Sequence, residues 1–301
     1  MRSHEGTPQI LVIIPTYNER ENLASIAARV LRSHDDAHVL IVDDNSPDGT
    51  GALASALASG HDRLHVLHRS GKEGLGAAYR AGFAWGLERG YNRLIEMDAD
   101  GSHQPEQLGR LLAGLETNDM VLGSRWVEGG EVQNWPLRRA LLSKSGSLYA
   151  RLALGIPYRD ITGGYRAFTA DALRAINFAG VLSQGYCFQI DMLRQAHLAG
   201  LRIGEVPITF VERLLGESKM SSGIVREAIM RVTVWGCEGL PARLRRRFST
   251  DAAAAGVTSA TAVPAVVVPA VVVPTLIAPA LVAPALVAFE ARSLQESVHA
   301  A

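Results

Sequence analysis

The chain has 301 residues, of which 48% are hydrophobic and 20% charged, so it can bury a sizeable core in one or two domains. Lysine plus arginine total 30, as do aspartate plus glutamate, and this balance argues against a nucleic-acid-binding protein, which carries a basic excess. The two cysteines, Cys187 and Cys237, show no paired spacing, and residues 1–9 lack the apolar core of a signal peptide. We therefore expect a reduced, cytoplasmic protein.

The N-terminal part alternates between short apolar strands and helices. The predicted strands are Ile10–Ile14, Val39–Val42, Leu64–Leu67 and Leu94–Met97. The predicted helices run from an N-cap at Asn18 to about Arg32, from Thr50 to about Ser59, and from Gly74-Leu75-Gly76 to about Arg89. Continuous apolar strands that alternate with helices predict an α/β fold, with a mostly parallel sheet covered on both faces.

From Met120 onwards the pattern is less regular. Extended segments are predicted at Met120–Gly123, Ile161–Phe168 and Ile203–Val211, with a Gly-rich loop at Gly129-Gly130. Helices are predicted at Leu137–Leu154, Asp171–Ala175, Phe188–Ala199 and Gly223–Glu238. The basic run Arg243–Arg247 follows, either as a solvated helix end or as a contact with anionic lipid head groups, which we favour slightly.

Beyond Thr250 the composition changes to alanine, valine, leucine and isoleucine. Prolines recur there with a period of five, at 264, 269, 274, 279 and 284. The apolar length would suit a membrane span, but each interior proline costs a helix about 3 kcal/mol. We expect a low-complexity, disordered tail over residues 248–301, with contact to a membrane or partner as the alternative hypothesis.

Polar side chains follow three of the predicted strands. They are Tyr17, Glu19, Asp43, Asp44, Asp98 and Asp100. In parallel sheets ligands bind beyond the carboxyl ends of the strands, so these side chains are expected to converge on one crevice. Taken alone, the run 43–49 is as well explained by turn formation as by function. Acidic or aromatic residues at the ends of three strands together favour a ligand-binding site over simple turn formation.

Asp98 and Asp100 predict a divalent metal site. Alternate residues of an extended chain point the same way, so both carboxylates can face one ion beside a turn at Gly101. Carboxylate oxygens suit Mg²⁺ or Mn²⁺, which complete their coordination with substrate phosphates and neutralise a departing diphosphate. Further anion-binding groups are Arg125, Arg213 and Lys219.

Five segments carry a resemblance to known enzymes. Residues 13–23 (IIPTYNERENL), 42–50 (VDDNSPDGT) and 97–100 (MDAD) resemble family 2 glycosyltransferases of the GT-A fold. Residues 185–189 (GYCFQ) and 204–219, which end in Gly216-Glu217-Ser218-Lys219, resemble the dolichol-phosphate and bacterial polyprenol-phosphate mannose synthases within that family. The resemblance covers residues 8 to 235.

The resemblance implies a GT-A (Rossmann-like) domain over residues 8–247 that precedes the tail. Within it we expect a nucleotide-sugar-binding half over 8–123, an acceptor half over 124–220 and a membrane-proximal helix over 221–247.

The resemblance also assigns roles to residues. Guanosine and ribose of GDP-mannose are expected at Pro15, Tyr17, Glu19, Val42 and Asp44. The diphosphate is expected, through the metal, at Asp98, Ala99 and Asp100. Phosphates are expected at Arg125, Arg213 and Lys219, and the acceptor's phosphate at Arg139 and Ser143. The catalytic set is Asp98, Asp100 and Arg125. Where some members carry a glutamine as a further metal ligand, this chain has Ser102.

The activity that the resemblance implies is metal-dependent, inverting transfer of mannose to a polyprenyl phosphate. The acceptor is already an anion, so catalysis needs positioning and neutralisation rather than a general base. Asp191 is therefore given no catalytic role. The expected partners are GDP-mannose, the lipid phosphate and the cytoplasmic face of a membrane; whether a separate membrane-anchoring subunit presents the lipid is left open.

Two alternatives remain at this point. One is a polyprenyl-phosphate glucosyltransferase that uses UDP-glucose, although such relatives typically carry two transmembrane helices that the proline-rich tail does not resemble. The other is a non-catalytic nucleotide-sugar-binding or scaffold subunit, which the presence of both Asp98 and Asp100 argues against. His103 is expected to support the acidic pair rather than bind metal, and Gly71–Gly76 to open a helix rather than hold phosphate.

Overall fold

The computed structural model describes residues 9–181, 183, 185–213 and 226–239. The chain divides into two compact units, Met1–Gly236 and Cys237–Ala301, and the fold is that of the first. Its strands are β1 (Ile10–Thr16), β2 (Ala37–Asp43), β3 (Leu64–His68), β4 (Arg93–Glu96), β5 (Met120–Ser124), β6 (Glu131–Gln133), β7 (Arg166–Thr169), β8 (Ile203–Pro207) and β9 (Thr209–Val211). Its α-helices are α1 (Arg20–Ser33), α2 (Thr50–Ser59), α3 (Leu75–Glu88), α4 (Leu108–Gly114), α5 (Leu137–Leu154), α6 (Ala170–Ile176) and α7 (Tyr186–Leu198), with a further helix that begins at residue 226 and continues to the end of this unit. Single 3₁₀ turns form at Pro105–Gln107 and Phe178–Gly180.

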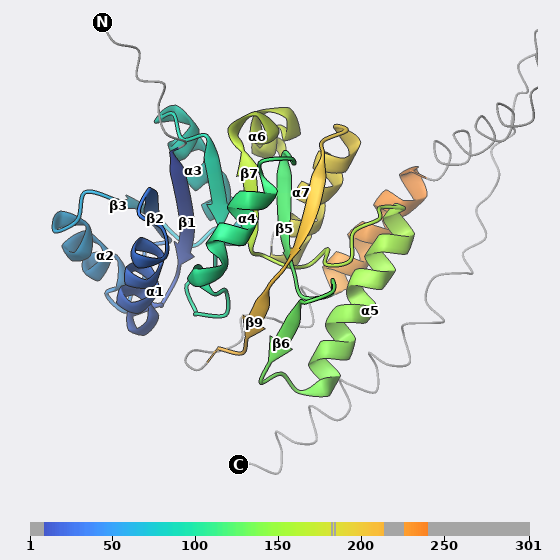
Figure 1. Cartoon of the computed structure of the whole chain (residues 1–301), viewed down its shortest axis with the longest axis horizontal. Helices are drawn as coiled ribbons and strands as arrows, with labels where there is room; N and C mark the ends of the chain where they lie inside the picture. The colour runs from blue at the N-terminus through green and yellow to red at the C-terminus, as the bar shows by residue number, and fades with distance from the viewer. Residues whose placement is uncertain (1–8, 182, 184, 214–225, 240–301) are drawn as a thin grey trace, which may run out of the picture. The chain divides into compact units, whose positions relative to one another are not determined.

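A central sheet has the strand order β3-β2-β1-β4-β7-β5-β8, and β6 pairs with β9 in a small second sheet (Figure 1). Strand β7 runs antiparallel to both of its neighbours, whereas the other pairs are parallel. Successive residues of β1 enter opposite cores: Leu11 and Ile13 pack into one, Val12 and Ile14 into the other, all with no exposed surface. The predicted mostly parallel α/β sheet, covered on both faces, is confirmed.

Most predicted elements form within a residue or two of their expected bounds, but the start of α1 differs from the prediction. Asn18 does not cap the helix, which begins at Arg20 after Glu19 and has no side-chain cap. Asn18 instead adopts a left-handed conformation with φ 56°, and its backbone N–H donates to the Ser46 hydroxyl at 3.1 Å. The tertiary contact between two strand-end loops decides its conformation.

The segment predicted as one strand over Ile203–Val211 is two strands. β8 pairs with β5 in the central sheet, and β9 lies outside that sheet and pairs with β6, which directly follows the predicted Gly-rich loop. Between them, the Ile208 N–H donates to the Ser124 carbonyl at 3.0 Å. An apolar run does not show where a chain changes its pairing partner. This change carries the chain from the central sheet toward the acidic strand ends.

Three smaller differences concern segments of irregular pattern. The extended segment predicted over Ile161–Phe168 is mostly loop before β7, β4 ends at Glu96, and α4 was not predicted. Of the helix predicted over Gly223–Glu238, residues 226–238 are described and helical. Residues 243–247, the proline-rich segment and Lys219 lie outside the described residues. The division of the chain into halves and a tail stays a prediction.

Candidate active site

The ends of β1, β2 and β4 lie side by side because β1 stands between the other two. In the register, Pro15 is the partner of Val42, and the Asp44 N–H donates to the Thr16 carbonyl at 3.1 Å. On the other side, the Met97 N–H donates to the Ile13 carbonyl at 3.1 Å, so the chain beyond β4 leaves beside β1. The structure therefore brings together the residues predicted for the nucleotide and those predicted for its diphosphate.

The turn after β2 is built by two of its three carboxylates. Asp43 accepts hydrogen bonds from the Ser46 hydroxyl at 2.6 Å and the Ser46 N–H at 3.2 Å. Asp48 accepts from the Thr50 hydroxyl at 2.6 Å and the Thr50 N–H at 3.0 Å. Although burial opposes it, these hydrogen bonds lower the pKa of Asp48. The turn-forming interpretation thus holds for Asp43 and Asp48.

Asp44 makes a different contact, an ion pair with Arg69, which also binds Glu73 at 2.8 Å. Burial raises the pKa of Asp44, and the Arg69 charge opposes that shift. Nearby, the Lys72 Nζ lies 4.1 Å from the centre of the Tyr17 ring. Arg69 and Lys72 were not among the predicted site residues. They follow the predicted strand Leu64–Leu67, so the rule that ligands bind beyond the carboxyl ends of parallel strands would have included them.

Asp98, Ala99 and Asp100, which we call the acidic turn, follow β4. Ala99 is buried, the Asp98 side chain is 36% exposed and that of Asp100 15%. Burial and the Asp100 charge raise the pKa of Asp98. Burial would do the same to Asp100, but the Ser102 N–H, which donates to its Oδ1 at 3.0 Å, and nearby charges lower its pKa. Two close carboxylates with opposite shifts form a local site of negative charge.

His103 is buried and is hydrogen-bonded to the backbone of the acidic turn. Its Nδ1 accepts the Asp98 backbone N–H at 3.0 Å, and its ring stacks on Tyr165 with centroids 5.1 Å apart. Burial lowers the pKa of His103, and the Nδ1 atom that accepts the Asp98 N–H is the lone-pair nitrogen of an imidazole. The expectation that His103 supports the acidic pair agrees with this geometry.

The segment beyond β9 brings a cation to the acidic turn. The Val211 N–H donates to the Ser102 carbonyl at 3.2 Å, and Phe210 forms a β-bridge with His103. Arg213 then lies with its Nη1 atom 3.4 Å from the Oδ2 atom of Asp100. An arginine beside two carboxylates is suited to a bound diphosphate, whose charge it would share with a metal ion.

Arg125 is held in the wall of the site. Its Nε and Nη2 atoms donate to Asp160 at 2.7 Å each, and Nη2 also donates to the Thr162 hydroxyl at 3.1 Å. Trp135 and Phe210 lie 5.5 and 5.3 Å from its guanidinium. The side chains of Arg125 and Asp160 are only 6% and 0% exposed, so this is a buried ion pair. Direct contact of Arg125 with phosphate stays a prediction.

Arg139 and Ser143, predicted for the acceptor, lie on α5. Arg139 forms an ion pair with Glu212, the residue before Arg213, and its guanidinium lies 4.4 Å from the centre of the Trp135 ring. Ser143 is half-buried one turn further along the helix. Through Glu212 the start of α5 is therefore tied to the segment whose next residue, Arg213, contacts Asp100.

The acidic turn fits part of a divalent metal site. Among the described residues, no three His, Cys, Asp or Glu side chains are grouped closely enough to hold an ion by themselves. Two carboxylates beside a turn suit Mg²⁺ or Mn²⁺, which commonly take one or two protein carboxylates and fill their remaining positions with water and substrate phosphates.

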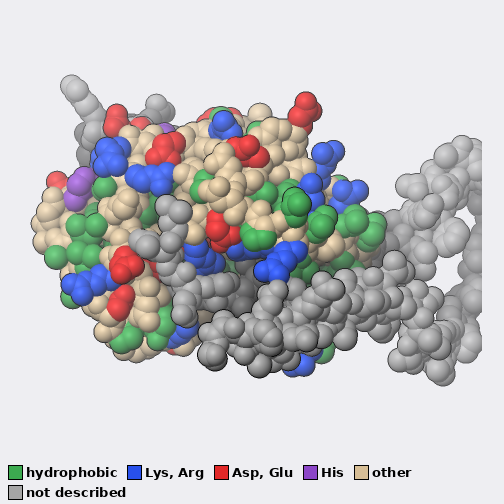
Figure 2. Space-filling view, turned by 90° about the horizontal axis from the view of Figure 1, so that it is seen from below, with side chains coloured by type: hydrophobic (Ala, Val, Ile, Leu, Met, Phe, Trp, Pro, Cys, Tyr) green, Lys and Arg blue, Asp and Glu red, His purple; other side chains and the backbone are tan. Residues whose placement is uncertain are grey.

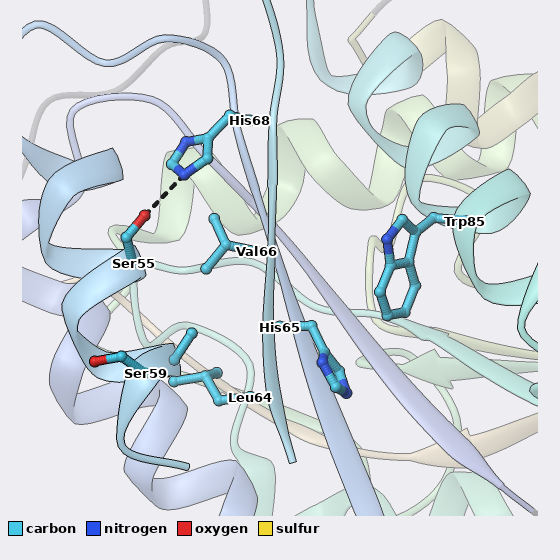
Figure 3. Close-up of a pocket in the computed structure, with 8 residues that line it drawn as sticks. Ser55, Ser59, Leu64, His65, Val66, His68 and Trp85 are labelled. Atoms are coloured by element: carbon cyan, nitrogen blue, oxygen red, sulfur yellow. Dashed lines mark hydrogen bonds between the residues drawn. The ribbon is translucent and has the colours of Figure 1, made fainter. Parts of the chain in front are cut away.

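A shallow hollow at the edge of the sheet lies apart from these residues. Ser55, His65, His68 and Trp85 help to line it around β3, the edge strand, and the Ser55 hydroxyl contacts His68 Nε2 at 2.8 Å (Figure 3). It is lined by no carboxylate and by none of the predicted site residues. We therefore take the ends of β1, β2 and β4, where the predicted site residues gather, as the candidate active site.

A mostly parallel sheet with an Asp-x-Asp turn and an arginine at its strand ends makes this an α/β protein, and the arrangement agrees with the GT-A fold that the resemblance implied. Residues 11–176 match the model of glycosyl transferase family 2. The chain belongs to this family and is a glycosyltransferase, as the resemblance in its motifs implied.

Two curated relatives narrow the comparison. The chain is 57% identical to the undecaprenyl-phosphate mannosyltransferase of Micrococcus luteus over 240 residues, which cover 78% of this chain and 99% of the relative. It is 55% identical to the polyprenol monophosphomannose synthase of Mycolicibacterium smegmatis over 241 residues, 79% of this chain and 91% of the relative. The predicted similarity to polyprenol-phosphate mannose synthases is confirmed.

Solved structures share the fold at low identity. One is glucosyl-3-phosphoglycerate synthase from Mycobacterium tuberculosis, bound to Mn²⁺, UDP and glucosyl-3-phosphoglycerate, with a TM-score of 0.57, 19% identity and coverage of 77% of this chain and 80% of that one. Another is the mannosyltransferase PcManGT from Pyrobaculum calidifontis with GDP-Man and Mn²⁺, with a TM-score of 0.50, 17% identity and coverage of 84% and 82%. These likenesses confirm the GT-A-like fold.

Proposed function

We propose that this protein transfers mannose from GDP-mannose to a polyprenyl monophosphate, with inversion at the anomeric carbon, and yields a polyprenyl β-D-mannosyl phosphate. The acidic turn binds Mg²⁺ or Mn²⁺ in this proposal. The observation that carries it is the position of Arg213 beside Asp100, at strand ends of a chain that matches a mannosyltransferase over 99% of that relative's length.

The donor lies across the ends of β1, β2 and β4. Its nucleoside occupies the space at the ends of β1 and β2, where Tyr17 and Asp44 are half-buried and buried. Its diphosphate reaches the acidic turn, where Arg213 offers a cation. The fold itself does not choose the base, because its neighbours hold either UDP or GDP-Man. GDP-mannose is proposed from the resemblance and from the mannosyl specificity in the relatives' names.

The bound metal ion would withdraw charge from the diphosphate as it leaves. Asp98 and Asp100 would hold it, and Arg213 would bind the same phosphates from the side of β9. The raised pKa of Asp98, caused by burial and by the Asp100 charge, fits this role, since a divalent cation would relieve both costs.

The acceptor phosphate is a ready nucleophile near neutral pH, so the protein's work is to bring two anions together in line. Arg139 and Ser143 on α5 would orient it. A general base is therefore not required. The environment of Asp191 agrees with this, because its carboxylate is buried and accepts a hydrogen bond from the Ser183 hydroxyl at 2.7 Å. Asp191 thus serves the packing of α7.

A lipid acceptor requires the enzyme to work at a membrane surface, and the proposal includes peripheral association with its cytoplasmic face. Within the described ranges, no helix combines the length and the apolar character needed to cross a bilayer.

The direct test is incubation with labelled GDP-mannose or UDP-glucose, a polyprenyl phosphate and Mg²⁺, followed by organic extraction. Label from GDP-mannose in the lipid phase is expected, and chelation with EDTA should abolish it until Mg²⁺ or Mn²⁺ is restored. Label from UDP-glucose alone would contradict the donor, and label from neither would contradict the enzyme activity. Asp100→Ala should remove transfer, whereas Asp171→Ala, on the exposed side of α6, should retain it.

A further inference from the structure

Two histidines and a tyrosine meet on the central sheet, away from the acidic turn. His38 is the second residue of β2, His65 is the second residue of β3, and Tyr91 lies between α3 and β4. The three residues therefore gather near the amino ends of parallel strands, whereas the candidate active site lies at the carboxyl ends. In Figure 1 the amino ends are at the top. The view from below in Figure 2 looks onto the carboxyl-end side, where acidic and basic side chains stand close together.

The polar atoms of these three side chains form a small triangle. His38 Nδ1 lies 3.2 Å from His65 Nε2, and the Tyr91 hydroxyl oxygen lies 2.8 Å from the first nitrogen and 3.3 Å from the second. Ligand atoms that bind a tetrahedral zinc ion at about 2.0–2.1 Å are about 3.3 Å apart. Two sides of the triangle already match this separation, so the three atoms fit one face of such a coordination shell.

Hydrogen bonds alone do not satisfy all three contacts of this triangle. A nitrogen of a neutral imidazole either donates or accepts, and a tyrosine hydroxyl carries a single proton. With one ring nitrogen as donor and the other as acceptor, two protons serve three contacts, and one contact lacks a proton of its own. A metal ion would instead use one lone pair from each of the three atoms.

Aromatic packing holds the rings in this arrangement. The Trp85 ring lies 5.2 Å from the ring of His65 and stacks on that of Tyr91 at 6.0 Å. Tyr91 also meets His38 edge-on, with ring centroids 5.6 Å apart, and is only 6% exposed. Ligands that their neighbours hold in place before an ion arrives lose less conformational entropy when they bind it.

The shallow hollow beside β3 gives an ion access to this cluster. His65 and Trp85 belong to its lining, and Figure 3 shows both on one side of β3, with Ser55 and His68 on the other. Solvent in the hollow can supply a water molecule as the fourth ligand, since zinc commonly binds three protein ligands and one water.

The surrounding charges favour an ion that displaces a proton. Arg63 donates to the carbonyl of Ala37, the residue before His38, at 3.1 Å, and the Arg89 guanidinium lies 4.1 Å from the centre of the Trp85 ring. Both cations oppose added positive charge. If Tyr91 binds as a phenolate, its proton passes to solvent, and a divalent ion then adds one net charge instead of two.

We propose that His38, His65 and Tyr91, which we call the His–Tyr site, bind a divalent transition-metal ion, with Zn²⁺ as the occupant. Imidazole and phenolate ligands suit Zn²⁺ or Cu²⁺, whereas Mg²⁺ prefers a shell of oxygen atoms. The His–Tyr site is therefore distinct in chemistry and position from the acidic turn, and the proposal does not depend on the proposed function. A bound ion would join β2, the edge strand β3 and the segment before β4.

Calorimetric titration of the full-length, EDTA-treated protein with Zn²⁺ tests the proposal, in neutral buffer with excess Mg²⁺. We expect one zinc ion per chain. His65→Gln, which removes one of the three ligands, should weaken binding at least about tenfold. His68→Gln is the matched control on the opposite face of β3, where it contacts Ser55, and should bind as the wild type does. Equal affinity of these three proteins would overturn the proposal, as would the absence of wild-type binding.

The acidic turn needs its own control in the same titration. Asp100→Ala should keep the zinc affinity of the wild type, because the His–Tyr site contains no residue of that turn. Loss of zinc binding in Asp100→Ala would place the ion at the acidic turn and overturn the proposal.

Copper reports the tyrosine ligand directly. Cu²⁺ bound to the wild type should show a phenolate-to-copper charge-transfer band in the visible spectrum, together with nitrogen hyperfine splitting in electron paramagnetic resonance. Tyr91→Phe should lose the band and keep the nitrogen signal, because the ring that stacks on Trp85 is retained. A band that persists in Tyr91→Phe, or a copper signal without nitrogen splitting, would contradict the assigned ligands.

Thermal unfolding separates the loss of a ligand from the loss of the fold. Zinc at about a hundredfold excess over its Kd should raise the Tm of the wild type by about 5 °C or more and leave that of His65→Gln unchanged. Far-UV circular dichroism checks that the variant is folded; if it is not, Tyr91→Phe takes its place with a correspondingly smaller zinc-induced shift. A wild-type Tm that does not respond to zinc would overturn the proposal.

Discussion

Arg213 and Asp100 are far apart in the sequence, yet the Nη1 atom of Arg213 lies 3.4 Å from the Oδ2 atom of Asp100. The contact depends on β9 leaving the central sheet, because the Val211 N–H then binds the Ser102 carbonyl beside the acidic turn. A carboxylate alone would repel a diphosphate. In the proposed function, the neighbouring arginine and a bound cation would turn the same place into one that attracts it.

Arg213→Gln should therefore slow transfer while the fold is retained. We expect kcat to fall about 10²–10³-fold, the usual effect of removing one charge-stabilising donor. Arg174→Gln on α6, whose partner Asp171 is exposed, is a control that should keep wild-type kinetics. Steady-state rates with labelled donor give the answer, and a kcat within about twofold of wild type would refute the role of Arg213.

Removing one partner of the buried Arg125–Asp160 ion pair should strongly lower the stability of the protein. Asp160→Ala leaves a guanidinium buried without its carboxylate, so the free energy of unfolding should fall by about 3–5 kcal/mol. Glu116→Gln, which removes the largely exposed partner of Arg93, should cost no more than about 1 kcal/mol. Urea denaturation of both variants measures the difference; similar small costs would contradict the burial of this pair as a source of stability.

Glu96 should make the protein less stable in alkaline solution. This residue is fully buried opposite Arg166, and burial raises its pKa from 4.5 to about 8. The folded state binds the Glu96 proton more tightly than the unfolded state does. The contribution of this proton to the free energy of unfolding is therefore fully present below pH 4.5 and is lost as the pH rises to about 8. Denaturation at about pH 6 and pH 9 should show this loss in the wild type and a smaller loss in Glu96→Gln. Parallel pH profiles of the two proteins would contradict it.

Because of His38 and His65, we expect the free energy of unfolding to fall in acidic solution as well. Their ring nitrogens lie 3.2 Å apart beside the Tyr91 hydroxyl, and burial, followed by nearby positive charge, lowers both pKa values below 6.5. The unfolded state therefore takes up protons first, and stability is lost as the pH falls below 6.5 toward the folded-state values. His65→Gln should flatten this part of the profile, measured by denaturation between about pH 7 and pH 5. A steeper acid loss in the variant would show that the assignment is wrong.

Local sequence patterns were sufficient for much of the fold. The helices Thr50–Ser59 and Leu137–Leu154 form with the predicted bounds, since apolar periodicity and turn residues act within a few positions of one another. The acidic residues after β2 and β4 were found in the same way. Asn18 shows the limit: its side chain suits a helix cap, but a hydrogen bond to Ser46 places it before the helix in a left-handed conformation.

By itself the sequence determined the alternation of strands and helices, the strand-end carboxylates and the family, because these depend on short-range patterns and contiguous motifs. Only the tertiary structure decided which of those residues meet. It paired Asp160 with Arg125 and Arg213 with Asp100, and it left four leucines of α5 outside the core, although their spacing in the sequence is that of an ordinary buried helix face. The physical reason is that strand pairing and burial are set by contacts between distant segments, which no local window contains.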